Sequence, residues 1–448
     1  MGKSKKSYGL FTTIAMIVGI CIGSGIFFKS DNILAATGGS VPLGVLVFVL
    51  SATSIIFGGL SMSELASRTD RPGGTIAYYE EFSSEKAACG MGWFQIFVYF
   101  PTIAVVVSWV VGIYICILFG WPGTLRNQIL IGFAYYTIAT AINAVSAKIG
   151  GGFQNFTTVS KMIPLIIVAV CGIFFGNPAK GFQSVSTGTL LGGTWLAAIG
   201  PIAFSFDGWT ISTTIAPEIR DSKKNLPRAL IIAPLIILVT YVAYFIGVTS
   251  LLDPKKIIAL QDAHVYVVAQ QLFGGFGAQL ILIAVILAVM GTANGIILGY
   301  IRLPYAMALH GRKMFPFSEK LSKLSGKWGM PVNSAIFCYV IMLFWTAVHI
   351  YTTQNNLLPN SDVSEISIVM SYLFYIILYF SVFRLFREGK IKSKFRGVVV
   401  PVIATLGSLF ILSGGLQNKL FPLYALFCIA VFAAALLFYR LRSTDVKE

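Results

Sequence analysis

Long apolar stretches recur along the whole chain, and they constrain its fold more than any other feature. One helix needs roughly 20 apolar residues to cross a hydrocarbon layer about 30 Å thick. Twelve stretches meet this requirement, at residues 9–36, 41–66, 88–119, 125–146, 149–175, 194–216, 228–252, 272–307, 331–352, 364–386, 397–416 and 420–440. They lack the alternation over about 10 residues that marks a membrane β-strand. We therefore expect an all-α protein that crosses a membrane twelve times.

The composition supports a lipid environment. Hydrophobic residues make up 56% of the chain. Charged residues make up 11%, against about 25% in an ordinary soluble domain. No loop is long enough for a soluble domain, so a catalytic domain in water is excluded. The glycines and prolines follow no period, which excludes a collagen-like chain.

The formal net charge of +16 indicates orientation in the membrane rather than binding to nucleic acid. Cytoplasmic loops of membrane proteins collect Lys and Arg. An even number of spans puts both termini on one side, and most basic residues fall there. The exceptions on the other side are Lys29, Arg126, Lys180, Lys255, Lys256 and Lys419. We expect a multi-pass protein of the cell (inner) membrane with both termini in the cytoplasm and no nucleic-acid partner.

The first span contains a cluster of small residues that predicts a break in the helix. Gly19, Gly23, Ser24 and Gly25 precede Ile26. Each glycine costs about 1 kcal/mol in a helix interior. One interpretation is a small-residue packing face, because Gly19 and Gly23 are four residues apart. The other is an unwound segment, in which the amides of Ser24, Gly25 and Ile26 form the positive end of a half-helix that suits a carboxylate.

The sixth span carries a second candidate break. Asp207 and Gly208 lie in its middle, and Pro201 precedes them. A mid-span Asp is costly unless it faces protein or water. A half-helix that ends here leaves carbonyl groups free between about Phe204 and Asp207, and these suit an ammonium group.

The two breaks together match the head of an α-amino acid, which has one carboxylate and one ammonium. They are the first spans of two five-helix units if the first ten spans form two repeats. Transporters with inverted repeats bind their substrate at such breaks, near the midplane. We therefore expect one membrane domain, with inverted repeats at about 9–175 and 194–386 and two extra helices at about 397–440.

Lys161 lies within the apolar fifth span, where a lysine costs about 3 kcal/mol on insertion scales. Three interpretations remain open. The lysine can be structural and bonded to backbone carbonyls. It can be a fixed ammonium in the place where other transporters of this fold hold sodium, with carbonyls near 18–21 as partners. It can also carry a proton, because burial makes a lysine easier to deprotonate.

Other polar residues give weaker signals. Asn294 in the eighth span can bond within the bundle or line the substrate path. The three histidines are scattered, and the six cysteines make no metal-binding spacing. We expect no cofactor, no metal and no enzyme activity.

Several motifs resemble one family, the L-type branch of the amino acid–polyamine–organocation (APC) superfamily. The resemblance extends over essentially the whole chain, and it is strongest to bacterial exchangers of alanine, serine, cysteine or threonine. The motifs are Gly23-Ser24-Gly25-Ile26-Phe27, Ser63-Glu64-Leu65 with Pro72-Gly73-Gly74 and Tyr78-Tyr79, Phe206-Asp207-Gly208-Trp209, and Pro217-Glu218 with Asn225-Leu226-Pro227-Arg228.

This resemblance implies a LeuT-type fold and sodium-independent exchange of small neutral L-amino acids. It implies that Ser24, Gly25 and Ile26 bind the substrate carboxylate. The carbonyls of Cys21, Phe204 and Asp207 would bind its ammonium. Closing of the pocket would involve Phe204 and Trp209, with Gly23, Gly208 and Asn294 beside them, and Lys161 would replace sodium.

Two points qualify the resemblance. Animal members are linked by a disulfide to a heavy chain through the loop between spans 3 and 4, but residues 120–127 contain no cysteine. We therefore expect no such partner. Asp207 can bond to nearby backbone amides, or it can favour cationic substrates. The alternative function is thus a proton-coupled symporter or an exchanger of cationic amino acids or amines.

Overall fold

The computed structural model describes residues 9–23, 25–69, 74–146, 153, 156–157, 161–180, 192–210, 219–310 and 314–444. The helices of the first half are α1 (Leu10–Cys21), α2 (Gly25–Ala36), α3 (Val41–Ala66), α4 (Thr75–Phe82), α5 (Glu85–Phe94), η1 (Gln95–Tyr99), α6 (Phe100–Phe119), α7 (Leu125–Val145), α9 (Met162–Phe175), η2 (Pro178–Lys180), η3 (Thr194–Ala198) and α11 (Ile199–Ser205). Those of the second half are α13 (Ser222–Leu251), α14 (Pro254–Leu260), η5 (Gln261–Ala263), α15 (His264–Tyr300), α16 (Leu303–Leu309), α17 (Ser318–Leu321), α18 (Val332–Gln354), α19 (Val363–Arg387), η6 (Phe395–Val399), α20 (Val400–Gly415) and α21 (Phe421–Thr444).

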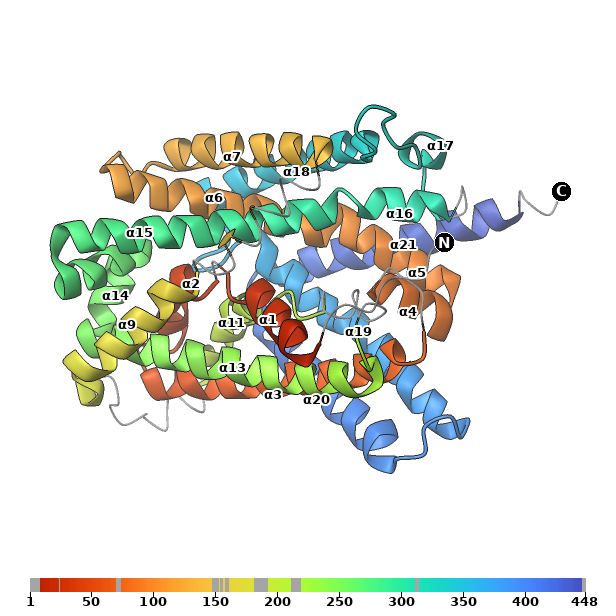
Figure 1. Ribbon diagram of the computed structural model, residues 1–448, viewed down its shortest axis with the longest axis horizontal. Helices are drawn as coiled ribbons and strands as arrows, with labels where there is room; N and C mark the ends of the chain where they lie inside the picture. Colours follow the sequence, from red (N-terminus) through yellow and green to blue (C-terminus); the bar gives the residue numbers. More distant parts are fainter. Residues whose placement is uncertain are drawn as a thin grey trace.

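The described residues contain nine helical segments that are long and apolar enough to cross a membrane. They are α3, α5 with α6, α7, α13, α14 to α16, α18, α19, η6 with α20, and α21. Their positions match nine of the twelve stretches expected from the sequence. Long helices such as α3, α7, α13 and α15 extend along the same axis of the molecule (Figure 1).

The other three expected spans correspond to shorter apolar helices. These lie within Leu10–Gly19, Met162–Phe175 and Thr194–Ser205. The first span is divided between α1 and α2, and α11 stops at Ser205, so both glycine-containing stretches are interrupted where the sequence predicts a break. Most residues between 147 and 160 lie outside the described ranges.

The eighth span differs from expectation at its start. The sequence predicts that it begins at residue 272, but α15 begins at His264 and is interrupted at Gly274. Gly274 has φ 69°, a left-handed backbone conformation that glycine adopts without steric cost. The helical path therefore continues through a kink that hydropathy alone does not reveal.

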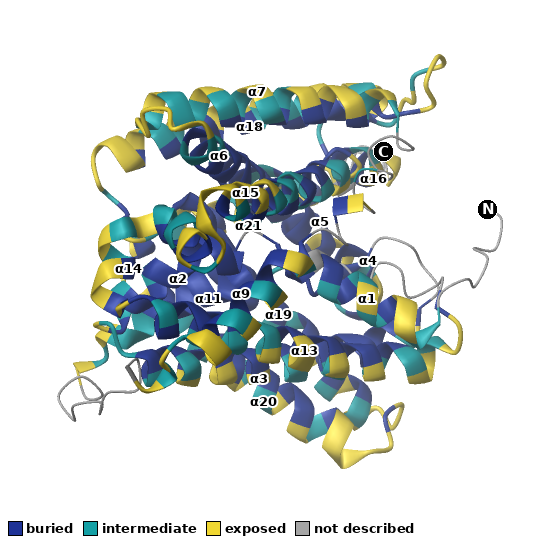
Figure 2. Ribbon diagram, turned by 60° about the vertical axis from the view of Figure 1, so that its left-hand side comes forward, coloured by how far each residue is buried: buried dark blue, intermediate teal, exposed yellow. Residues whose placement is uncertain are grey.

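Buried residues concentrate in the middle of the bundle, around α2, α11 and α19 (Figure 2). The outer faces carry exposed apolar side chains such as Phe174, Val239 and Leu423. Large apolar side chains exposed on many helices are expected of a protein solvated by lipid. The protected interior is where α1, α2 and α11 meet.

Candidate functional site

The first break lies between α1 and α2, and its carbonyl groups have identified donors. Ile22 leaves the helical conformation, with ψ 94°, and its N–H donates to the carbonyl of Val18 at 2.9 Å. The carbonyl of Gly19 accepts a hydrogen bond from the Lys161 ammonium. Helix ends leave such carbonyls without intrahelical donors. Side chains from elsewhere in the bundle therefore satisfy this end of α1.

The second break follows α11, which ends at Ser205. The N–H of Asp207 donates to the carbonyl of Phe204 at 3.1 Å and closes a turn. Gly208 then takes φ 99°, which strongly favours glycine at this position. The helix is thus interrupted next to Asp207 and Gly208, where the sequence predicts a break.

Tyr241 on α13 joins the two breaks. Its hydroxyl lies 2.9 Å from the carbonyl oxygen of Cys21 and 2.7 Å from that of Ser205. The side chain is fully buried. One phenol therefore ties the last residue of α1 to the last residue of α11.

Two glycines of the first span lie so close to neighbouring helices that a larger residue does not fit at either position. A Cβ atom at Gly25 would lie 2.6 Å from the Cα of Ser205. A Cβ atom at Gly23 would lie 2.6 Å from the Oγ1 of Thr292 on α15. Real Cβ atoms essentially never show contacts under 3.0 Å. Gly25 therefore allows the start of α2 to pack directly on α11, and Gly23 allows the break before α2 to pack directly on α15.

A cavity of about 190 Å³, here called the central cavity, opens where these segments meet. One water occupies roughly 10–15 Å³ of such space, so the cavity accommodates a small solute. Its lining comes from both breaks, from α6 with the residue before it, and from α15: Cys21, Gly23, Gly25, Tyr99, Phe100, Ile103, Val107, Phe204, Asp207, Gly208, Thr292, Gly295, Ile296 and Leu298. Gly25 opens α2, and the first-turn amides of a helix give that end partial positive charge. The cavity thus has a positive helix end on one side and the carboxylate of Asp207 on another.

Tyr99 holds Asp207 in the cavity wall. Its hydroxyl lies 2.7 Å from Oδ1 and 2.6 Å from Oδ2 of the carboxylate. Tyr99 ends η1, a single π-helical turn, in which the N–H of Phe100 reaches the carbonyl of Gln95. Pro101 follows and has no N–H for the carbonyl of Phe97, which accepts a bond from the indole N–H of Trp345 instead. Such π-turns are frequent at functional sites, and this one sets where Tyr99 lies.

Asp207 therefore has a side-chain donor on another helix in addition to any local amide. The sequence predicts nearby backbone amides or a cationic substrate as its partners and does not identify Tyr99. Tyr99, Tyr241 and Thr292 are each one of several polar residues in a mainly apolar span, so the sequence gives no signal that singles them out. Their importance follows from the way the helices pack.

The remaining predicted residues lie around the cavity rather than in its lining. Ile26 follows Gly25 and is fully buried, and Trp209 donates from its indole N–H to the Tyr372 hydroxyl at 3.3 Å. Asn294 accepts a bond from Asn143 at 2.8 Å across α7 and α15. Lys161 is 1% exposed and contacts the end of α1.

Some predicted residues cannot be placed. Ser24 lies outside the described residues, as do the motif residues Pro72, Gly73, Pro217 and Glu218. The six cysteines are all free thiols. Within the described part of the chain, no group of three His, Cys, Asp or Glu residues could hold a metal ion.

Comparison with known proteins gives extensive matches. The sequence profile of a family described as amino acid permease matches residues 8–442. The serine/threonine exchanger SteT of Bacillus subtilis (strain 168) is 31% identical over 420 residues, which cover 92% of this chain and 91% of that protein. The b(0,+)-type amino acid transporter 1 of Mus musculus is 27% identical over 453 residues, covering 97% and 87%. The Asc-type amino acid transporter 1 of Homo sapiens is 28% identical over 326 residues, covering 68% and 60%.

Proposed function

The chain belongs to the amino acid permease family of the APC superfamily, and from this membership we propose that it exchanges small neutral L-amino acids such as Ala, Ser, Cys or Thr. It is an amino acid transporter and not an enzyme. It is also a multi-pass membrane protein. The proposal adds the substrate class, the exchange mechanism and the independence from sodium.

The observation that carries the proposal is the meeting of two broken helices at one small cavity. In our proposal the substrate carboxylate lies at the start of α2, against the amides of Ser24, Gly25 and Ile26. The ammonium faces the carbonyls of Cys21, Phe204 and Asp207. Cys21, Gly25, Phe204 and Asp207 all line the cavity, which supports this orientation.

The cavity wall also supports a small side chain. Phe100, Ile103, Val107 and Ile296 provide an apolar part of its lining, on α6 and α15. Phe204 and the segment from Gly208 to Trp209 would move when the pocket closes. The relative named as a serine/threonine exchanger supports the same substrate size.

We propose that Lys161 replaces the sodium ion of related transporters. Its ammonium contacts the carbonyl of Gly19, one helical turn before the break. A fixed cation there holds the end of α1 without a dissolved ion. This contact supports sodium-independent transport and agrees equally with a structural role, so the position needs a direct test.

The architecture that we propose is the LeuT-type fold, with twelve spans, inverted repeats at about 9–175 and 194–386, and two further helices. Alternating access would then follow from tilting of the half-helices against the rest of the bundle. We place both termini in the cytoplasm because most Lys and Arg residues fall on that side of the membrane. We expect the chain to work without a disulfide-linked heavy chain.

Uptake of radiolabelled L-serine into sodium-free proteoliposomes tests the proposal. Vesicles are empty or preloaded with unlabelled L-alanine, each with and without a pH gradient. We expect uptake only into preloaded vesicles and no effect of the gradient. Uptake into empty vesicles driven by the gradient would instead establish proton-coupled symport.

One observation favours a second candidate, the exchange of cationic amino acids. The Asp207 carboxylate lines the central cavity, where it could pair with a substrate ammonium or guanidinium. Failure of L-serine and L-alanine to exchange, together with exchange of L-lysine or L-arginine, would establish this candidate.

A further inference from the structure

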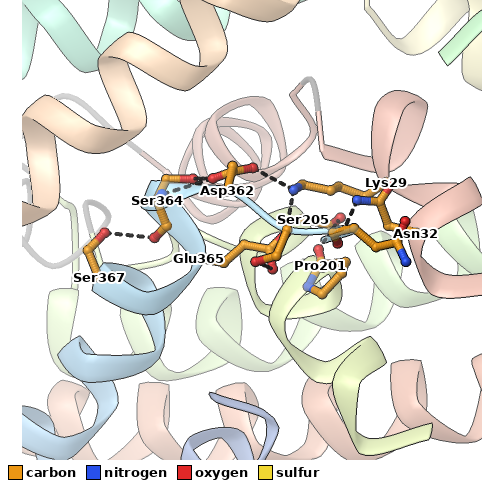
Figure 3. A network of polar contacts seen from close by, with 10 residues as sticks. Lys29, Asn32, Pro201, Ser205, Asp362, Ser364, Glu365 and Ser367 are labelled. Carbon is orange, nitrogen blue, oxygen red and sulfur yellow. Dashed lines mark hydrogen bonds and ion pairs between the residues drawn. The ribbon is translucent and has the colours of Figure 1, made fainter. Parts of the chain in front are cut away.

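A buried ion cluster joins α2 to the start of α19 (Figure 3). The ammonium of Lys29 lies 2.6 Å from Oδ2 of Asp362 and also contacts Glu365. The three side chains are at most 5% exposed. Charge patterning alone assigned Lys29 to a loop side of the membrane and indicated no partner for it.

The two carboxylates are positioned by their own segment. Asp362 caps α19, because its Oδ1 accepts the N–H of Ser364 at 2.8 Å. Glu365 accepts the hydroxyl of Ser361 at 2.7 Å. The acidic half of the cluster is thus fixed on α19, and the basic half is carried by the half-helix that follows the first break.

A second cavity lies on the far side of this cluster. It measures about 450 Å³ and is here called the vestibule. Its deep wall includes Gly200 and Glu365, which are buried, and its rim includes Asn360, Gln417 and Lys419, which are exposed. The vestibule therefore reaches the surface of the protein.

One face of α2 extends from the central cavity to the vestibule. Gly25 lines the central cavity, whereas Asn32 and Ala36 line the vestibule. Lys29 lies four residues after Gly25 and three before Asn32, and Ala36 follows four residues later. This spacing puts the four residues on one face of the helix. Lys29 is thus the residue between the two cavities on α2.

α11 shows the same order. Gly200 lines the vestibule and Phe204, one helical turn later, lines the central cavity. A turn spans about 5.4 Å. The Lys29 ammonium lies 5.1 Å from the Phe204 ring centroid, and a Cβ atom at Gly200 would lie 2.8 Å from Oε2 of Glu365. The cluster therefore fills the thin wall between the cavities.

We propose that Lys29, Asp362 and Glu365 form the closed gate of a passage between the central cavity and the vestibule. The inference rests on the proposed alternating access. Amino acids pass on this side only when α2 moves away from α19 and the ion pairs separate. The side chain of Asn32 adds a neutral bond of 2.8 Å to the carbonyl of Asn360 across the same seam.

The chemistry of the cluster suits a contact that must break. Buried ions lose hydration, and this loss offsets much of their attraction, so a buried ion pair contributes little net stability. When the seam opens to water, the separated charges regain hydration. An apolar seam would instead expose apolar surface to water in the open state. Ion pairs thus close the passage while keeping the two states close in free energy.

Cys21 offers a native reporter for the test, since it lines the central cavity. The reference protein retains Cys21 and carries serine or alanine at the other five cysteines. A membrane-impermeant thiol reagent is applied separately to each side of sealed membranes, from intact cells and from inverted vesicles. The labelling rate of Cys21 from the vestibule side reports opening of the gate.

The main variant is Lys29→Met with Asp362→Asn and Glu365→Gln, which removes all three charges and leaves none unpaired. Glu365→Gln alone is the second variant, because it preserves the contact between Lys29 and Asp362 and guards against misfolding. We expect labelling from the vestibule side to rise roughly tenfold in the first variant, with a smaller rise in the second. Lys390→Met is the matched control, since it breaks an exposed pair with Glu388 at 2.8 Å and should change nothing.

Unchanged labelling in both variants, with each protein eluting as a single folded species, would overturn the gate. Labelling needs no transport, so the result is independent of the proposed function. If the reference protein exchanges no amino acid and the triple variant still shows the rise in labelling, the result would contradict the exchange proposal and support the passage. Normal exchange with unchanged labelling would contradict only the gate.

Discussion

The hydroxyl of Tyr99 lies within hydrogen-bonding distance of both carboxylate oxygens of Asp207, at 2.7 and 2.6 Å. The carboxylate is thereby held against the wall of the central cavity by η1, on a different span. A carboxylate that is already bonded is a weaker partner for a substrate. This contact offers a physical reason why a pocket containing an aspartate can serve neutral amino acids.

Removing that contact should change substrate preference. In Tyr99→Phe the carboxylate of Asp207 loses its phenol donor and becomes available to a cationic side chain. A hydrogen bond to a charged group contributes about 1.5–3 kcal/mol. We expect the concentration of L-lysine that halves L-serine exchange to fall by about tenfold. Adding Asp207→Asn should abolish this gain, and a double variant that still binds L-lysine tightly would contradict the explanation.

Tyr241→Phe should weaken exchange without unfolding the protein. The change leaves the carbonyls of Cys21 and Ser205 without their shared donor, at a cost of about 1–3 kcal/mol. We expect a several-fold higher KM for L-serine and a lower maximal rate in proteoliposomes. Tyr244→Phe is the control, because Tyr244 is buried on the same helix and its hydroxyl bonds to no described residue. Equal kinetics in the two variants would exclude a role for the Tyr241 bridge.

Lys161→Ala separates the interpretations of the buried lysine. The variant removes the donor to the Gly19 carbonyl at the end of α1. If the ammonium replaces sodium, exchange should fall more than about tenfold while the protein remains folded and monodisperse. Lys256→Met, an exposed lysine on α14, is the control. Exchange by Lys161→Ala at the wild-type rate would reject the assigned role. If the unmodified protein instead responds to a pH gradient, loss of that response in Lys161→Ala would establish the proton carrier.

The sequence predicts the scaffold well because hydropathy and glycine act locally. The nine long spans and the interruptions near Gly23 and Gly208 follow from residues adjacent in the chain. The contact of Lys161 with the end of α1 was also expected among the carbonyls near 18–21. The roles assigned to these residues remain predictions.

Contacts between distant helices could not be predicted in the same way. Tyr99, Tyr241 and Thr292 are ordinary residues in apolar spans until packing brings them to the breaks. Lys29 and Glu365 are 336 residues apart in sequence and meet only in the bundle. The apolar sequence around these residues indicates that burying their charges costs free energy, but it does not indicate which charges pair.

The contact between Gly23 and Thr292 allows a rescue experiment. Gly23→Ala should reduce exchange strongly, because the new Cβ would lie 2.6 Å from Oγ1 and 2.9 Å from Cγ2 of Thr292. Adding Thr292→Gly removes both atoms and should restore much of the activity, whereas Thr292→Gly alone reports the cost of losing that side chain. Gly25→Ala meets the backbone of Ser205 instead, so truncating the Ser205 side chain should not rescue it. Exchange rates of the single and double variants give the coupling free energy between positions 23 and 292 directly. Full activity of Gly23→Ala would mean that the first break and α15 do not pack this closely in the working transporter.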